Sequence, residues 1–104
     1  MNSSEHLDAI FAALADPTRR AILARLTAGA TSVQDLMRPF RISQPAISKH
    51  LRVLEAAGLV SQTKQGQLRP RTLQPQVLAL VDAWLEPYRP YWQGQKKLKL
   101  GIHS

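Results

Sequence analysis

The segment RISQPAISKHLRVLEAAGLV, residues 41–60, predicts one amphipathic helix with clear ends. Ser43 can accept a hydrogen bond from a free amide at a helix start, and Pro45 is tolerated in the first turn. Gly58 is typical of the residue that follows a helix end. The residues expected to face a core recur at spacings of three and four, and they are Ile47, Leu51 and Leu54.

The opposite face of this helix is polar and basic. With about 100° of rotation per residue, Pro45, Lys49 and Arg52 lie on the side away from Ile47. Gln44 and Ser48 add short polar side chains to the outer surface. A basic helix face is often only a solvated surface, so its purpose has to be judged from the rest of the chain.

The charge of the whole chain indicates the kind of partner. The 104 residues suffice for one domain, carry a formal net charge of +7 at pH 7 and include no Cys. Seven of the 14 Lys and Arg residues lie between Arg38 and Arg71, where Glu55 is the sole acid. A surface of this kind attracts polyanions such as nucleic acid or acidic lipid. The absence of Cys excludes disulfides and thiolate metal sites, and it favours a cytoplasmic protein.

Three further helices are predicted before residue 41. The first carries a single apolar stripe made of Leu7, Ile10, Phe11 and Leu14. Asp16 and Pro17 form a start signal for the second, whose buried residues should be Ile22, Leu23 and Leu26. Ser32 and Asp35 form an acidic version of a capping box that opens a short third helix, and Pro39 should end it.

A small hairpin is predicted after the helix that ends near Gly58. The segments LVSQTK (59–64) and QLRPRTL (67–73) read as two short strands around a tight turn at QG, with Pro70 confining the second to an edge or a bulge. A short helix, the turn FRIS (40–43), a second helix and a basic hairpin are the parts of a winged helix-turn-helix. The predicted fold class is therefore mainly α, with about five helices and a two-stranded wing.

Four stretches together resemble the ArsR-type winged-helix transcriptional regulators of bacteria. They are ALADPTRRAILARL (13–26), ISQPAISKHLRVLEAAGLV (42–60), KQGQLRPRTL (64–73) and VDAWLEPYRPYW (81–92). The most specific parts are DPTRR and the pattern S-x-P-x-x-S-x-H-L, filled by Ser43, Pro45, Ser48, His50 and Leu51. The resemblance covers roughly residues 5–92. It implies a homodimer that binds an operator and represses transcription, often of its own operon, until an inducer loosens it.

The predicted partner is therefore double-stranded DNA, bound by the outer face of the helix and by the wing. The candidate DNA-binding residues are Ser43, Gln44, Pro45, Ser48, Lys49, Arg52, Lys64, Arg69 and Arg71. Within that set, Gln44, Ser48 and Lys49 are the expected base contacts. The cations of the wing should hold phosphates or minor-groove edges, because contacts from a flexible hairpin position the protein on DNA more than they determine sequence specificity.

A homodimer is predicted because the segment VLALVDAWL (77–85) is apolar all the way round, with Asp82 its sole charged residue. A helix that covers one domain needs only one apolar stripe, so the remainder should be covered by a second copy. The candidate dimer residues are Leu7, Ile10, Phe11, Leu14, Val77, Leu80, Val81, Trp84, Leu85 and Tyr88. The predicted domains are 1–92 for DNA binding and dimerisation, and 93–104 for a basic C-terminal tail. Pro87 and Pro90 are expected either to kink or end the helix and free this tail, or to redirect Tyr91 and Trp92 onto the partner.

Several residues have a structural interpretation beside a functional one. His50 is expected to be half-buried and bonded to a backbone carbonyl, with contact to a DNA phosphate as the alternative. Arg19, Arg20 and Arg25 are expected to pair with Asp16 or Glu55, or to be exposed, rather than to contact DNA. The aromatic residues Trp84, Tyr88, Tyr91 and Trp92 are interpreted as core or interface rather than as a platform for stacked bases.

Other classes of function fit the sequence less well. An RNA-binding protein of the translation machinery is the alternative, although the candidate recognition helix has no aromatic residue to stack on a splayed base. An enzyme is not expected, since His6, His50 and His103 are far apart and no nucleophile motif or Gly-rich phosphate loop occurs. A protein-interaction adaptor would leave the basic block unexplained. No run of roughly 18 apolar residues is present, so neither membrane spanning nor secretion is indicated.

No cofactor and no metal are expected. Metal-sensing members of the family that this chain resembles place a Cys-rich stretch where this sequence has SVQDLMRP (32–39). The C-terminal segment VLALVDAWLEPYRPYW (77–92) contains no His, and Asp82 and Glu86 are its only acids. We therefore expect operator affinity to stay constant during titration with stoichiometric zinc, and a clear change would refute this. The sequence identifies no small-molecule inducer, so that partner stays open.

Overall fold

Four helix starts are fixed by side chains that accept hydrogen bonds from backbone amides. The predicted caps are confirmed, because Asp16 accepts from the amide of Arg19 at 3.0 Å, Ser32 from Asp35 at 3.1 Å and Ser43 from Ala46 at 3.2 Å. The capping box at Ser32 is incomplete, because the Asp35 carboxylate pairs with Arg38 at 3.1 Å and does not accept from the amide of Ser32. Asn2 and Glu5 close a complete capping box at the first helix, which is not among the caps predicted from the sequence.

This computed structural model describes residues 2–93. The elements are α1 (Ser3–Leu14), α2 (Pro17–Leu26), α3 (Val33–Met37), α4 (Gln44–Ala56), β1 (Val60–Gln62), β2 (Arg71–Leu73), α5 (Pro75–Leu85) and the 3-10 helix η1 (Glu86–Tyr91). The predicted fold class, mainly α with a two-stranded wing, is confirmed. Of the tail predicted over 93–104, only Gln93 falls within the described residues, so the domain boundary stays a prediction.

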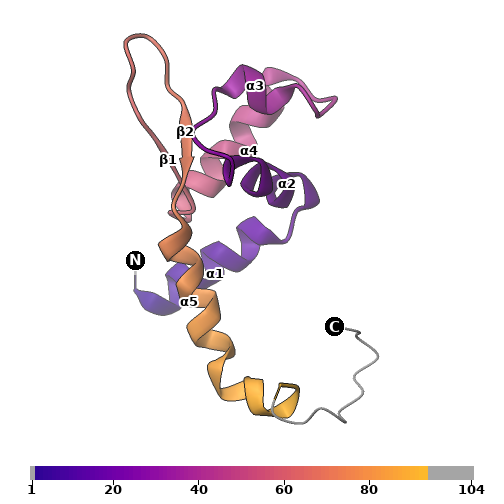
Figure 1. Ribbon diagram of the computed structural model, residues 1–104, viewed down its shortest axis with the longest axis vertical. Coiled ribbons are helices and arrows are strands. Elements are labelled where there is room, and N and C mark those ends of the chain that lie inside the picture. The colour runs from indigo at the N-terminus through magenta and orange to yellow at the C-terminus, as the bar shows by residue number, and fades with distance from the viewer. Residues whose placement is uncertain (1, 94–104) are drawn as a thin grey trace.

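The core lies among α1, α2, α3, α4 and the start of β1 (Figure 1). Its buried residues are Ile10, Ala13, Ile22, Leu23, Leu26, Leu36, Ile47, Leu51, Leu54, Ala57, Leu59 and Val60. The predicted core face of α4 is confirmed, because Ile47, Leu51 and Leu54 are all 0% exposed. Burial of this one stripe leaves the opposite face of α4 on the outside of the bundle.

The wing is a short antiparallel ladder with a longer extended loop. Val60 pairs with Leu73, Ser61 with Thr72 and Gln62 with Arg71. These strands are shorter than predicted, because Pro70 has no amide to donate and ends the regular pairing. The predicted turn at QG is confirmed, with Gly66 at φ +61° between Gln65 and Leu68, whose backbones bond to each other.

The base of the wing is held to the bundle through β2. The amide of Arg71 donates to the carbonyl of Thr31 at 2.8 Å, and the amide of Thr31 donates back to Arg71 at 3.0 Å. Thr31 belongs to the connection between α2 and α3, so the hairpin cannot swing freely at its base. The loop beyond it projects from the body on the side where α3 and α4 lie (Figure 1).

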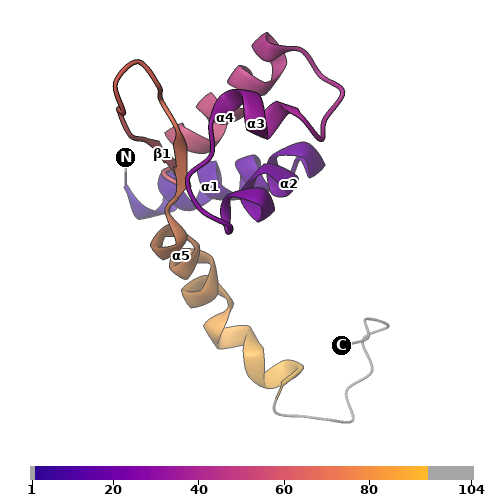
Figure 2. The same ribbon diagram turned by 45° about the horizontal axis from the view of Figure 1, so that its top comes forward.

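Helix α5 begins against the body and then runs away from it, as both views show (Figures 1 and 2). Its start meets the ends of α1 and α4, where His6 Nε2 lies 2.8 Å from the carbonyl oxygen of Ala57. Gly58 has φ +78°, and a side chain there would lie against His6 and Val77. No residue of α5 is buried, and no helix within residues 2–93 is long and apolar enough to cross a membrane.

Candidate nucleic-acid interface

The outer face of α4 presents the predicted polar side chains together. Gln44, Pro45, Lys49 and Arg52 are exposed, as is the cap Ser43, while Ser48 is half-buried. They share one surface because the apolar stripe on the other side anchors the helix in the core. This face can enter a groove of duplex DNA, since an α-helix fits the major groove of B-DNA.

The wing lies beside the N-terminal end of this helix. An open groove of about 500 Å³ separates the wing from α3 and the start of α4, and Gln44 lines it together with Gln67 and Arg69. Lys64 and Arg69 are exposed on the wing. The structure thus brings two predicted DNA-binding residues, Gln44 and Arg69, to the same groove.

Arg71 is placed differently from the other cations of the wing. Its Nε donates to the Glu55 carboxylate at 2.7 Å, and only 12% of its side chain is exposed. Glu55 also accepts from Gln62 at 3.2 Å, so both strands of the wing are tied to α4. This pair holds the wing against the recognition helix, and we assign Arg71 that structural role in place of the DNA contact expected from the sequence.

Most of the basic block remains available to a polyanion. Arg38 and Arg71 are held by Asp35 and Glu55 respectively. The other cations of the block make no ion pair with any residue in 2–93, and they are Arg41, Lys49, Arg52, Lys64 and Arg69. Arg41 is not among the DNA-binding residues predicted from the sequence. Its exposed position in the turn just before α4 makes it a further candidate, and the sequence signal for it was a basic residue within the turn FRIS (40–43).

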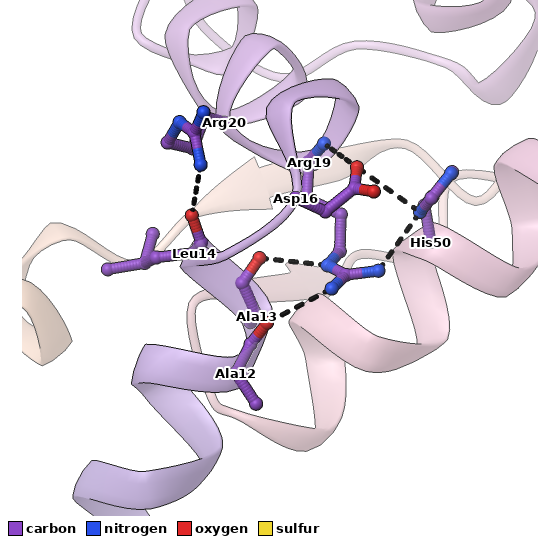
Figure 3. Close-up of polar contacts among 7 residues, drawn as sticks. All are labelled: Ala12, Ala13, Leu14, Asp16, Arg19, Arg20 and His50. Carbon is purple, nitrogen blue, oxygen red and sulfur yellow. Dashed lines mark hydrogen bonds and ion pairs between the residues drawn. The ribbon is translucent and has the colours of Figure 1, made fainter.

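Arg19 and Arg20 of α2 hold the end of α1 (Figure 3). Arg19 donates from Nε to the carbonyl of Ala13 at 2.8 Å, and Arg20 donates to that of Leu14 at 2.6 Å. Cationic side chains at these carbonyls interact favourably with the negative end of the helix dipole. The guanidinium of Arg19 thus binds backbone carbonyls of α1, and not the Asp16 or Glu55 carboxylate, whereas Arg20 and Arg25 are exposed, which is the other outcome expected from the sequence.

His50 lies beside these arginines, on the flank of α4 between its core face and its outer face. It is half-buried as predicted, but its hydrogen-bond partner is Arg19 Nη1 at 3.2 Å from His50 Nδ1, and not a backbone carbonyl. The Asp16 carboxylate is 3.9 Å from the same nitrogen. The sequence could not identify this partner, since Arg19 and His50 are 31 positions apart.

Asp16 has a pKa lowered from its ordinary value. The main cause is the backbone amide of Arg19, which donates to the carboxylate and favours its charged form. His50 and the Arg19 side chain act in the same direction through their charge, while partial burial of the carboxyl opposes them.

We expect Asp16→Asn to lose less stability on acidification than the wild type. A carboxyl whose pKa is depressed in the folded state stabilises that state above its unfolded pKa, and this contribution is lost as the pH falls through the folded pKa. Asn keeps an oxygen that can cap α2 but carries no charge. Urea unfolding at pH 6 and at about pH 3 should show a difference between the two proteins that shrinks at the lower pH. An unchanged difference would contradict this role of the Asp16 charge.

The predicted dimer residues fall into two groups. Phe11, Leu80, Trp84 and Tyr88 are 37%, 42%, 45% and 48% exposed, which is unusual for large apolar side chains. The rings of Phe11 and Trp84 meet edge to face at 5.3 Å, and Trp84 lies 5.3 Å from Tyr88, so aromatic rings of α1, α5 and η1 form one surface. We call Phe11, Leu80, Trp84 and Tyr88 the aromatic face.

The other predicted dimer residues are less exposed. Leu7, Leu14, Val77, Val81 and Leu85 are half-buried in the single chain, and Leu14, Val77 and Val81 pack on its own core. Ile10 is 0% exposed, so its assignment to the dimer interface is wrong. The apolar residues of α1 face two directions: Phe11 faces outward, whereas Ile10 faces the core of its own chain.

Comparisons with known proteins agree with this architecture. Residues 14–63 match a family model described as a helix-turn-helix domain. The chain is 40% identical over 88 residues to the HTH-type transcriptional regulator Rv2034 of Mycobacterium tuberculosis, covering 85% of this chain and 82% of that protein. It is 38% identical over 76 residues to the transcriptional repressor SdpR of Bacillus subtilis, covering 73% of this chain and 84% of the repressor.

A solved structure gives the same family. The crystal structure of the ArsR family transcriptional regulator RHA00566 superposes with a TM-score of 0.78 at 39% identity, covering 88% of this chain and 95% of that one. The alternative of an RNA-binding protein of the translation machinery finds no support in these relatives. The fold, the matched domain and the relatives together show that this chain is a helix-turn-helix transcriptional regulator and belongs to the ArsR family.

Proposed function

We propose that the protein is a homodimeric repressor that binds a near-palindromic operator by placing α4 in the major groove. The observation that carries this proposal is the exposed outer face of α4, whose cations make no ion pair with any residue in 2–93 and which lies beside an equally basic wing. Repression is the activity that the name of the relative SdpR states for that protein. The proposed regulator acts in the cytoplasm and has no catalytic activity.

Each group of residues has a distinct proposed contact with DNA. Gln44, Ser48 and Lys49 contact base edges, since they project from the N-terminal half of α4, which usually reads bases in this motif. Lys64 and Arg69 on the wing, with Arg41 in the turn, hold phosphates on either side. Arg52 lies one turn further along α4 than Ser48, and it contacts either a base or a phosphate. Ser43 and Pro45 shape the start of the helix against the backbone of the DNA.

The aromatic face supports the homodimer. Four large apolar side chains in one patch are costly to leave in water, and a second copy presents an identical patch for them. Joining two chains by this face sets the two α4 helices about 34 Å apart, which is one turn of DNA, in the usual arrangement of dimeric regulators. A two-fold protein then requires an operator with two similar half-sites. Regulation by a small-molecule inducer is compatible with this arrangement, and regulation by a transition metal is not proposed because the chain has no Cys.

The salt dependence of binding tests the electrostatic part of the proposal. We expect the logarithm of affinity for duplex DNA to fall by roughly 0.9 per logarithm of salt for each phosphate that the protein neutralises. If Arg52 holds a phosphate, Arg52→Ala should lower that slope by about 1 and weaken binding to all sequences alike. If Arg52 contacts a base, the variant should lose about 1–3 kcal/mol on the preferred site and relax its preference there.

A charge-matched control separates these effects from net charge. Arg25 lies exposed on α2 and makes no side-chain hydrogen bond with any residue in 2–93, so Arg25→Ala removes one charge outside the interface. We expect it to bind nearly as the wild type does. A wild-type affinity that is independent of salt, or equal losses in the two variants, would contradict the proposed interface.

A further inference from the structure

Arg19 makes three side-chain hydrogen bonds that join three helices (Figure 3). Nε donates to the carbonyl of Ala13 at 2.8 Å and Nη2 to that of Ala12 at 3.0 Å, so two nitrogens hold the end of α1. The third, Nη1, lies 3.2 Å from Nδ1 of His50 on α4. The backbone amide of the same residue is fixed by Asp16 at the start of α2. One guanidinium therefore connects α1 to α4, with α2 carrying it.

The contact with His50 has a defined direction. A guanidinium can only donate, so this bond is made by the neutral His50 ring, with Nδ1 as the acceptor and the ring proton on Nε2. Only 23% of the His50 side chain is exposed, so water competes weakly for this bond. Within residues 2–93, His50 is the side chain of α4 that is hydrogen-bonded to α2, whereas Glu55 binds the wing.

A directional bond at this point matters because, within residues 2–93, the other polar ties of α4 lie at its C-terminal end, where Glu55 binds the wing and the carbonyl of Ala57 meets His6. Ile47, Leu51 and Leu54 keep the helix in the core, but apolar contacts are not directional and tolerate small rotations or slides. Hydrogen bonds to base edges need donor–acceptor distances of about 2.7–3.2 Å. Ser48 and Lys49 directly precede His50 in the chain, so a fixed position of His50 fixes theirs.

The other end of the connection lies next to the aromatic face. Ala12 and Ala13, whose carbonyls Arg19 holds, follow Phe11 directly on α1. Phe11 packs against Trp84 of α5 at 5.3 Å. The same arginine therefore touches the backbone beside the proposed dimer contact and the flank of the helix proposed to enter DNA.

We propose that Arg19 is a positioning residue for DNA recognition, which sets α4 relative to α1 through His50. This inference rests on the proposed function, since it assigns to Arg19 the placement of the side chains that contact bases. Arg19 contacts no DNA itself. Its loss weakens binding to the preferred sequence while binding to unrelated sequence, which depends on phosphates, is kept.

The test uses the full chain and two duplexes. The first is a duplex selected by the wild-type protein from random-sequence DNA, and the second is a scrambled duplex of the same length and composition. The variants are Arg19→Ala, His50→Leu, His50→Asn and the control Arg25→Ala, each first checked for its thermal unfolding midpoint. His50→Leu removes the acceptor but leaves the bonds of Arg19 to α1, whereas Asn offers an amide oxygen near the position of Nδ1.

We expect Arg19→Ala and His50→Leu to lose at least tenfold in affinity for the selected duplex relative to Arg25→Ala, with their affinity for the scrambled duplex within threefold of that control. His50→Asn should restore most of the loss. If Arg19→Ala fails to fold, the two His50 variants alone decide. Wild-type affinity in His50→Leu, or a loss in His50→Leu that His50→Asn does not restore, would overturn the proposal.

Two further results have defined meanings. An equal loss by both His50 variants on both duplexes, with a smaller salt slope, would show that His50 holds a phosphate, and this also overturns the positioning role. Failure of the wild type to select any sequence would instead refute the proposed function itself. The two failures are thus distinguishable within one series of measurements.

Discussion

Leu80→Asp is expected to convert the dimer into a folded monomer and to lower operator affinity by about 10²–10⁴-fold. Leu80 is 42% exposed in the single chain and lies in the aromatic face, so the substitution removes little from the chain's own core. In the dimer, it places carboxylates on a surface that must be dry, where a buried unpaired charge is costly. The second half-site then no longer adds to the first, because each chain binds alone.

Sedimentation at micromolar concentration measures the first effect, and titration of a two-half-site duplex measures the second. Ala24→Asp is the matched control, since it adds the same charge at an exposed position of α2 outside the aromatic face. This control should stay dimeric and lose only a small factor in affinity. A wild type that sediments as a monomer, or a Leu80→Asp protein that stays dimeric, would show that α5 does not form the dimer interface.

Leu51→Ala is expected to destabilise the fold by about 2–5 kcal/mol, the usual cost of truncating a fully buried leucine. Leu51 is 0% exposed and lies in the middle of α4, among the other residues of its core face. The loss is a large part of the roughly 5–15 kcal/mol that stabilises a typical domain. Urea unfolding should show a lower midpoint with an unchanged slope.

The neighbouring residue supplies the contrast. Arg52 is exposed on the opposite face, so Arg52→Ala should change stability by about 0.5 kcal/mol or less. Its effect should instead appear in DNA affinity. A Leu51→Ala protein with the urea midpoint of the wild type would contradict the burial of Leu51 in the core.

Local signals in the sequence predicted the recognition helix well. The start of α4 at Ser43, its end before Gly58 and its buried stripe are all observed, because each depends on neighbours within one or two turns. The turn at Gly66 was predictable for the same reason, since a positive φ favours glycine. The shorter strands reflect Pro70, whose effect on the ladder was foreseen in kind but not in extent.

Contacts between distant segments were not predictable from periodicity. The pairing of Arg71 with Glu55 takes a cation out of the expected interface, and nothing local distinguishes Arg71 from Arg69. His50 binds Arg19 across 31 positions, which only the packing of α2 on α4 determines. Ile10 turned out to be core because α1 packs on α4 with the same stripe that was expected to meet a second copy.

The most direct test of the central claim is selection of bound duplexes from random-sequence DNA by the wild-type protein at physiological salt. We expect enrichment of a near-palindrome whose two half-sites are centred about 10 base pairs apart, which matches recognition helices about 34 Å apart. Recovery of no common sequence, or of a single half-site bound by one copy, would contradict the claim that this regulator acts as a dimer through α4.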